Sequence, residues 1–417
     1  MNTEAGAELS LSHVLRPEIA ADPYPLYHRL RSEDPVRWDA PLNAWVVTRY
    51  ADVQSALGDA RLSAERINLS TEWLPEAMRQ TLGPVFRALS RQMLFLDPPD
   101  HTRLRGLVNK AFTPRVVEGT RPRIQAIVDD LLGAVQEAGR MDVIQDFAYP
   151  LPAIVIAEML GVPPEDRDQF RLWSDDFGAL IGRSDLTLDG ATRALRGVAA
   201  FMDYFRDIVA RRRASPRDDL MQALIAAEDR GDALTEEELL ANCVLLLAAG
   251  HGTTTHLIGN GLLALLRNPD QLRKLRDDPS SIVAAVTEVL RYDSPVQATG
   301  RVAADEILIG ARRVGVGEGV ILCLGAANRD PEQFADPDRL DIGRRANRPI
   351  AFGHGIHFCL GAPLARVEGQ IALTAVAQRF PDLELTADEP EYKENIVLRG
   401  LASLPLQFTP AVAGASR

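Results

Sequence analysis

The chain has 417 residues, of which 46% are hydrophobic and 25% are charged, as in an ordinary globular protein. Its net charge of −12 argues against binding to nucleic acid, which requires a basic surface. Three cysteines are too few for a disulfide framework, and neither a signal peptide nor an apolar run long enough to span a bilayer is visible. We therefore expect a cytoplasmic protein without a membrane anchor.

The chain is predicted to form one domain. No segment between residues 24 and 408 has the composition of a linker, a repeat or a low-complexity block. The domain is expected to cover residues 1–417, with residues 1–20 as a loosely ordered N-terminal segment and residues 409–417 as a tail.

The N-terminal part of the chain predicts a β-hairpin followed by helices. Residues 36–38 and 45–48 favour strands, and a turn-rich segment lies between them. Residues 60–95 follow no regular pattern. Helical periodicity covers residues 51–57, 121–160 (interrupted near Pro150), 165–213 (with a loop at 182–189), 281–292 and 362–378.

The longest predicted helix begins after Thr235. This threonine and Glu238 match a capping box, and an acidic first turn suits the helix dipole. The helical pattern continues to Arg267, a length of about 45 Å at about 1.5 Å per residue. Residues 301–324 and 383–408 look partly extended. The predicted fold class is therefore mainly α, with small β regions near the two ends of the chain.

The most informative segment runs from Phe352 to Gly361 and contains Cys359. Its glycines let the backbone turn sharply and lie flat against a large planar group. The thiol directly precedes the predicted helix 362–378, whose N-terminal N–H groups favour a thiolate. A thiolate against a planar group describes haem iron with a sulfur axial ligand, which promotes O–O cleavage. The alternative is a buried structural cysteine beside a glycine turn.

At this segment the chain resembles the cytochrome P450 family, whose cysteine loop reads Phe-x-x-Gly-x-x-x-Cys-x-Gly. Phe352, Gly355, Cys359 and Gly361 match its four fixed positions, and His357 matches the bacterial form. The resemblance covers nearly the whole chain and is closest to soluble actinobacterial enzymes that modify polyketides, macrolides and related natural products. It implies a single-domain cytochrome P450 fold, a helix-rich body that encloses haem b, with Cys359 bound to the iron and Gly361 beside it.

The resemblance also implies binding residues for the haem propionates. These residues are His101, Arg105, Arg301 and His357. The spacing of His101 and Arg105 puts them on one helix face, and arginine binds carboxylates well. Each residue alone could equally be an ordinary surface residue, but four in family order favour the propionate assignment.

A second motif implied by the resemblance is structural. Glu288 and Arg291 match Glu-x-x-Arg, which the family joins to a later arginine, here Arg339, in a buried network. Taken alone, the pair could be an exposed ion pair of little energetic weight.

The middle of the longest helix departs from the family pattern Ala-Gly-x-acid-Thr. Ala249, Gly250 and Thr253 match it, but Gly252 stands where the family has the acid that helps deliver protons. His251 is expected to point away from the iron. Protons then reach oxygen through Thr253 and ordered water or a polar group of the substrate. The alternative is a reaction that depends less on proton delivery to the bound oxygen, such as desaturation, oxidative coupling or oxidation by peroxide.

The resemblance implies a haem-thiolate monooxygenase that inserts one oxygen atom from O₂ into a C–H or C=C bond of a small hydrophobic, natural-product-type substrate. No flavin or nicotinamide domain fits in the chain, so a ferredoxin and its reductase are the expected electron donors to a monomeric protein. A haem-binding sensor without turnover is the alternative from a different class. The substrate pocket is expected to involve residues 60–95, 170–195, 295–300 and 396–402, which do not identify the substrate.

A basic patch for the electron donor is one interpretation of four arginines near the cysteine loop. They are Arg344, Arg345, Arg348 and Arg366. A complementary patch would speed association with an acidic donor. The same arginines could equally form a solvated face.

Overall fold

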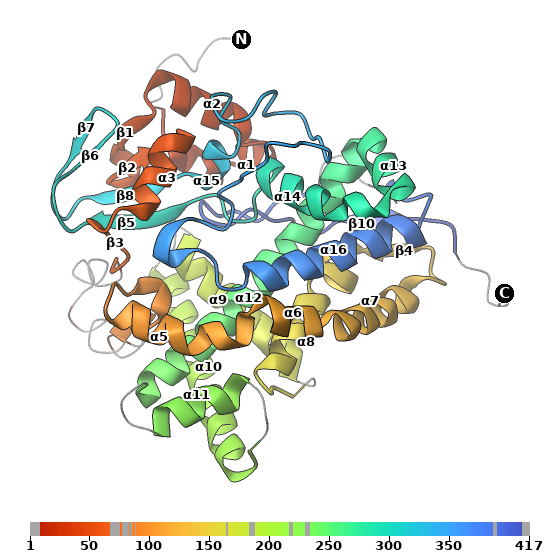
Figure 1. The fold of residues 1–417 in the computed structure, drawn as a ribbon, viewed down its shortest axis with the longest axis horizontal. Coiled ribbons are helices and arrows are strands. Elements are labelled where there is room, and N and C mark those ends of the chain that lie inside the picture. Colours follow the sequence, from red (N-terminus) through yellow and green to blue (C-terminus); the bar gives the residue numbers. More distant parts are fainter. Residues whose placement is uncertain are drawn as a thin grey trace.

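Helices make up most of the structure, and most of the strands gather at one end of it (Figure 1). The computed structural model describes residues 9–66, 89–163, 166–182, 188–216, 220–229, 234–386 and 390–410, and a few isolated positions between residues 76 and 87. Half of the expected pocket segment 60–95, part of the loop 182–189 and most of the tail 409–417 lie outside the described residues.

Five strands form the main sheet, in the order β1–β2–β8–β5–β3. They are β1 (Val36–Asp39), β2 (Ala44–Val47), β8 (Gly319–Leu322), β5 (Thr299–Ala303) and β3 (Leu62–Ser63). The predicted hairpin of β1 and β2 is confirmed as an antiparallel pair. β2 pairs in parallel with β8, so the sheet joins the N-terminal hairpin to the strands of residues 299–322.

The smaller sheets come from the C-terminal half and from one earlier strand. β6 (Ile307–Ile309) and β7 (Arg312–Val314) form a hairpin. β4 (Arg140–Asp142), β10 (Pro405–Gln407) and β9 (Glu384–Leu385) form a three-stranded sheet.

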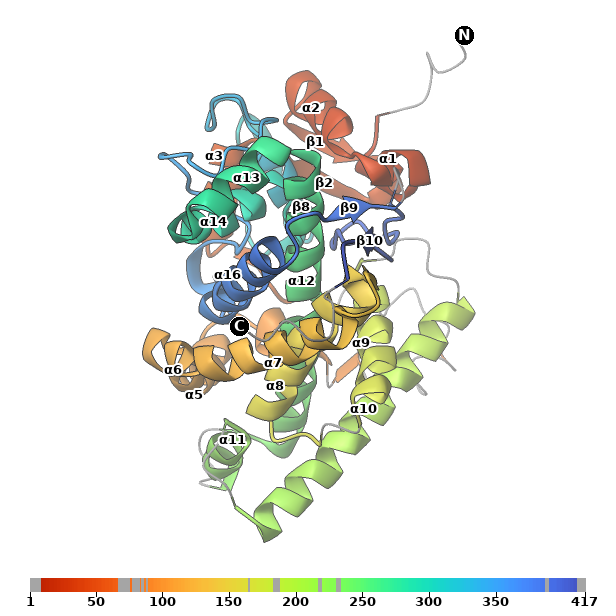
Figure 2. The same ribbon diagram turned by 90° about the vertical axis from the view of Figure 1, so that its right-hand side faces the viewer.

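The central helix α12 (Glu236–Arg267) runs through the middle of the molecule (Figures 1 and 2). Its predicted capping box is confirmed: Glu238 N–H donates to Thr235 Oγ1 at 3.3 Å, and Thr235 N–H donates to Glu238 Oε2 at 2.8 Å. It packs against α8 (Pro150–Met159), α16 (Ala362–Arg379) and α10 (Leu188–Ala214). Because neighbours surround it, most of its side chains are buried, leucines above all.

The remaining helices cover this centre. The longer ones are α2 (Tyr24–Glu33), α3 (Tyr50–Gly58), α5 (Asp100–Val108), α7 (Arg121–Val135), α9 (Arg167–Gly182), α11 (Leu220–Asp229), α13 (Pro269–Asp277) and α14 (Ile282–Tyr292). The shorter ones are η1 (Leu11–Leu15), α1 (Pro17–Ala21), η2 (Ala40–Leu42), η4 (Met93–Phe95), η5 (Asn109–Phe112), α6 (Pro114–Gly119), η8 (Pro279–Ser281), α15 (Leu324–Ala327) and η9 (Gly355–His357).

The helical prediction over residues 121–160 is wrong in one respect. Between α7 and α8 the chain forms β4 and the π-helical segment η6 (Val143–Ala148). The Asp142 carboxylate accepts hydrogen bonds from the N–H groups of Ile144 and Gln145 and from Ser403 Oγ. The interruption therefore depends on pairing with the C-terminal strand β10, a contact that local periodicity cannot reveal.

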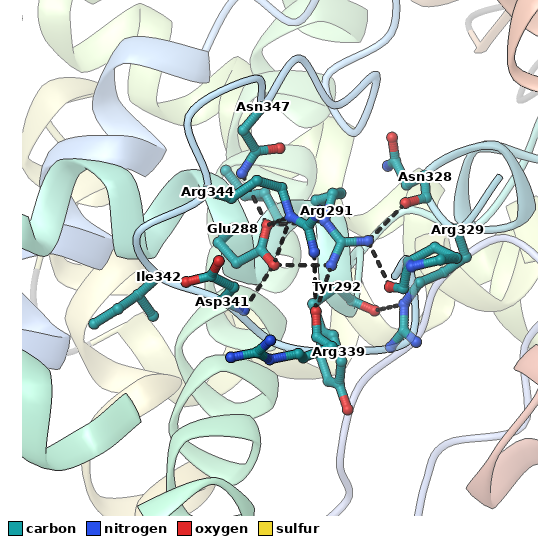
Figure 3. Close-up of polar contacts among 12 residues, drawn as sticks. Glu288, Arg291, Tyr292, Asn328, Arg329, Arg339, Asp341, Ile342, Arg344 and Asn347 are labelled. Atoms are coloured by element: carbon teal, nitrogen blue, oxygen red, sulfur yellow. Dashed lines mark hydrogen bonds and ion pairs between the residues drawn. The ribbon is translucent and has the colours of Figure 1, made fainter. Parts of the chain in front are cut away.

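Glu288 on α14 lies at the centre of a buried network (Figure 3). Its carboxylate accepts from Arg291 Nε and Nη2, each at 2.8 Å, and both side chains are fully buried. Arg291 also donates to the backbone carbonyls of Asn328, Pro337 and Arg339. The network thus fixes the irregular segment 328–347, which leads to the cysteine loop.

The second arginine of this network is Arg344, whereas the sequence analysis assigned Arg339. Arg344 Nε lies 3.2 Å from Glu288 Oε1, and Asn347 Nδ2 donates to Glu288 Oε2 at 2.9 Å. Arg339 is exposed and joins the network through its backbone carbonyl. The turn around Arg339 directs the carbonyl inward, and the sequence offers no signal for choosing among neighbouring arginines. Arg344 is consequently occupied and does not belong to the predicted basic patch.

Replacing Arg291 with leucine should lower the free energy of unfolding by about 3–5 kcal/mol, because Glu288 would keep a buried charge without its main partner. Denaturation in urea, followed by circular dichroism, measures the change. As a control, Glu33→Gln breaks the exposed Arg29–Glu33 pair at 3.3 Å on α2 and should cost less than about 1 kcal/mol. Equal costs for the two variants would contradict this interpretation.

Candidate functional site

A cavity of about 770 Å³ lies between α12 and the cysteine loop, residues 352–361. Its volume is in the range of small-molecule sites. It brings together predicted residues from four separate parts of the chain: His101, Arg105, Ala249, Gly250, Gly252, Thr253, Arg301, His357, Cys359 and Gly361. All four expected pocket segments also contribute, with Met93, Phe177, Val296 and Leu398 among the lining residues.

The cysteine loop is a tight turn that presents Cys359 to the cavity. Cys359 N–H donates to the Phe352 carbonyl at 2.9 Å, which closes the loop. Gly353 and Gly355 have φ values of 74° and 72°, in the left-handed region that favours glycine. A Cβ at Gly355 would lie 2.9 Å from the Leu57 carbonyl oxygen on α3. Only glycine therefore lets the loop approach α3 this closely.

The Cys359 sulfur lies just before the N-terminus of α16. Burial raises the pKa of the Cys359 thiol, while the N–H groups of Gly361 and Ala362 and the charges of Arg105 and Arg366 act in the opposite direction. Arg105 Nη2 also donates to the Phe358 carbonyl at 2.7 Å, and Arg366 lies over the Phe352 ring at 4.6 Å. The surroundings thus favour an anionic sulfur once a cation in the cavity offsets the cost of burial.

Two histidines and an arginine line the cavity, and no acid among the described residues forms a hydrogen bond or an ion pair with them. The rings of His101 and His357 lie 4.2 Å apart, and His101 Nδ1 and His357 Nε2 have no hydrogen-bond partner in the described structure. Burial, together with the charge of Arg301 and the neighbouring His101, lowers the pKa of His357 to about 3. Arg301 is buried and donates to the Gly300 carbonyl at 2.8 Å. This edge of the cavity suits a ligand with carboxylates.

The opposite wall is the middle of α12. Thr253 Oγ1 donates to the Ala249 carbonyl at 2.9 Å, and Thr254 and Thr255 also donate to carbonyls four residues earlier. Such bonds tend to bend a helix. His251 Nδ1 bonds to the Leu247 carbonyl oxygen at 3.0 Å.

The two glycines of this wall differ in their surroundings. A Cβ at Gly250 would lie 3.0 Å from Ile156 Cγ1, so close packing against α8 explains this glycine. A Cβ at Gly252 would meet nothing within 4 Å. The absence of an acid at position 252 therefore has no steric cause.

Sequence analysis did not identify Glu368 on α16, a buried acid close to α12. Burial raises its pKa to about 8, a hydrogen bond with Thr254 acts in the opposite direction, and Glu368 Oε2 has no partner in the described structure. It lies inside a helical pattern where a glutamate normally indicates an exposed position. No local signal in the sequence could have revealed it.

Comparison with known proteins gives a consistent result. The family model described as "Cytochrome P450" matches residues 79–409. The vitamin D(3) 25-hydroxylase of Pseudonocardia autotrophica is 44% identical over 94% of this chain and 95% of its own. The polyketide biosynthesis cytochrome P450 PksS of Bacillus subtilis is 40% identical over 94% of this chain and 97% of its own.

A solved structure is similar over almost the same length. P450BioI in complex with hexadec-9Z-enoic acid ligated acyl carrier protein has a TM-score of 0.88 and 40% identity, and covers 94% of this chain and 99% of that chain. Within the residues that the structure describes, no helix is both long enough and apolar enough to cross a membrane.

The raised pKa of Glu368 predicts a specific pH dependence of stability. Between the unfolded pKa, about 4.3, and about 8, the folded protein binds the extra proton, so stability falls as the pH rises through this window. Glu368→Gln removes that dependence. The free energy of unfolding of the variant, relative to the parent protein, should rise by roughly 2–4 kcal/mol from pH 5 to pH 8.

Urea denaturation of both proteins across this pH range provides the measurement. Glu332→Gln, at an exposed position, serves as the control. A difference between Glu368→Gln and the parent protein that stays constant with pH would show that the carboxyl does not titrate as expected.

Proposed function

The chain belongs to the cytochrome P450 monooxygenase family, and from this premise we propose that it inserts one oxygen atom of O₂ into a C–H or C=C bond of a hydrophobic natural-product-type substrate. The main support for this proposal is that Cys359 and Thr253 line the same cavity. The names of the relatives, a vitamin D(3) hydroxylase and a polyketide biosynthesis enzyme, support the substrate class.

The family implies a haem cofactor, here proposed to be haem b, and the residues present fit it. Cys359 offers sulfur for the iron. The glycines of the loop permit a close approach of the macrocycle. His101 and His357 each offer a ring nitrogen without a hydrogen-bond partner in the described structure, and Arg301 hydrogen-bonds the Gly300 carbonyl. With Arg105, these residues are proposed to hold the two propionates. When bound, the haem supplies the reductive activation of O₂ and the transfer of one oxygen atom.

The chain's own residues then stabilise the charge on the sulfur, shape the space above the macrocycle and position water for proton transfer. The N–H groups of Gly361 and Ala362 stabilise the charge on the Cys359 sulfur. Ala249 and Gly250 leave room above the macrocycle because they carry little or no side chain. Thr253 Oγ1 donates its proton to the Ala249 carbonyl, so its lone pairs can accept a hydrogen bond from water and position it.

The path of protons differs from the family pattern because of Gly252. The open space at this position can hold ordered water, which would connect Thr253 Oγ1 with solvent. A polar group of the substrate could fill the same space. Desaturation, oxidative coupling or oxidation driven by peroxide would need this connection less, and these reactions are the second candidate, favoured by the missing acid alone.

Electrons are proposed to come from a ferredoxin that docks over the cysteine loop of the monomeric protein. Arg345 and Arg348 are exposed near the loop, and Arg366 is half-buried. Ile356 and Phe358, which flank His357, are 54% and 40% exposed. Positive charge around a small apolar area suits an acidic protein partner. The three free cysteines agree with a reducing cytoplasm.

Turnover with separate electron donors tests the proposal. Holoprotein supplied with a surrogate ferredoxin, its reductase and NADPH should add one atom of ¹⁸O from ¹⁸O₂ to vitamin D(3), myristic acid or a macrolactone, as mass spectrometry measures. Thr253→Ala should lower the yield and raise peroxide release. Turnover with hydrogen peroxide alone, or haem binding without any product, would contradict the proposal and favour a peroxygenase or a sensor, respectively.

The missing acid has its own test. Gly252→Glu should lower the peroxide released per product by several-fold, because the open space accepts the side chain and restores a proton donor. Gly252→Gln has the same size without a titratable group and should not do so. If Gly252→Glu leaves both product and peroxide at parent levels, the absence of the acid has no mechanistic meaning.

A further inference from the structure

Arg66 is a cation on the cavity wall to which the sequence motifs assign no role. It follows β3 and lines the cavity. Its guanidinium lies 4.5 Å from the centre of the Phe95 ring, and Nη1 makes one long hydrogen bond, 3.4 Å, to the Ala64 carbonyl. Among the described residues, no carboxylate forms an ion pair with it.

Arg66 lies beside the predicted propionate-binding residues. A Cβ at Gly300 would be 3.1 Å from Arg66 Cδ, so the side chain runs along β5 next to Arg301. Burial, together with the charge of Arg301, lowers the pKa of Arg66 to about 9. Arg66 also lowers the pKa of His357. Arg66, Arg301, His101 and His357 therefore form one cluster, here termed the cationic rim.

Asp97, whose charge acts on the cationic rim, forms its hydrogen bonds with β3 and the residue that follows it. The Asp97 carboxylate accepts from Ser63 Oγ at 2.5 Å and from Ala64 N–H at 3.0 Å. Its charge acts on Arg301, His101 and His357, but it forms no ion pair with Arg66 among the described residues.

The charges around the rim are unbalanced. Of the two arginines in the rim, Arg301 lies within the influence of the Asp97 charge, whereas no carboxylate among the described residues forms an ion pair with Arg66. A buried charge without a counter-ion is strongly unfavourable. A ligand that carries two carboxylates on one edge would remove the imbalance.

We propose that Arg66 binds a carboxylate in the loaded cavity, namely a haem propionate, in addition to the four residues that the family motif assigns. The inference rests on the proposed function, which supplies the haem. The position of Arg66 beside Arg301 and His357, which are proposed to bind the propionates, favours a propionate over a substrate carboxylate as its partner. The same chemistry would suit an acidic substrate, so the experiment separates the two sources.

The rate of haem transfer from the holoprotein to excess apomyoglobin tests whether Arg66 binds a propionate. Arg66→Gln should speed haem loss about 10-fold to 100-fold, the range expected for one charge-assisted hydrogen bond. Arg66→Lys keeps the charge and should restore most of the retention. Arg61→Gln, which removes an exposed arginine paired with Asp59 at 2.7 Å, should leave the rate unchanged.

The thermal stability of the haem-free protein separates binding from a structural role. Arg66→Gln should leave the apoprotein as stable as the parent or more stable, because it removes an uncompensated charge. A loss of stability in the apoprotein that matches the loss in the holoprotein would overturn the proposal. If the parent protein binds no haem, the proposed function fails, whereas equal haem loss from parent and variant overturns the role of Arg66 alone.

A second experiment tests whether Arg66 binds a substrate carboxylate instead. It measures the affinities for myristic acid and 1-tetradecanol by spectroscopic titration. Under the proposal, Arg66→Gln changes the affinities for the acid and the alcohol by the same factor. A selective loss of affinity for myristic acid, with haem retention at the parent level, assigns Arg66 to the substrate and overturns the propionate assignment.

Discussion

The position of one sulfur atom, held at the cavity wall just ahead of a helix N-terminus, is the constraint on which the site depends. The Cys359 N–H bonds to the Phe352 carbonyl, and two glycines with positive φ close the turn around it. Burial opposes a charge on this sulfur, whereas N–H groups and two guanidinium groups favour it. The protein alone leaves these influences opposed, and a metal cation inside the cavity would settle them in favour of the thiolate.

The rest of the molecule fixes the position of this turn relative to the opposite cavity wall on α12. The buried pair of Glu288 and Arg291 holds the segment before the loop through backbone carbonyls and Arg344. α16 begins directly after the loop and packs against α12, so the sulfur lies just ahead of one of two contacting helices and Thr253 lies on the other. Positive charge gathers at one edge of the cavity, as expected for a planar apolar ligand with acidic substituents.

Local patterns predicted much of this structure. The hairpin of residues 36–47, the capping box at Thr235 and the end of α12 at Arg267 follow from turn residues, caps and periodicity, which act over a few positions. The break at β4 and η6 could not be predicted because it depends on pairing with residues 405–407. The family motif located the cavity residues, but Arg344, Arg66 and Glu368 became visible only through their neighbours, since arginines and glutamates on helices and loops look alike in sequence.

Binding of carbon monoxide to the reduced holoprotein tests the central claim, that the Cys359 sulfur is the axial ligand of the haem iron. The claim predicts the strongly red-shifted Soret band of thiolate ligation, and its loss when serine replaces Cys359. A Soret band at the position typical of histidine-ligated haem in the parent protein, or an unchanged red-shifted band in Cys359→Ser, would contradict it.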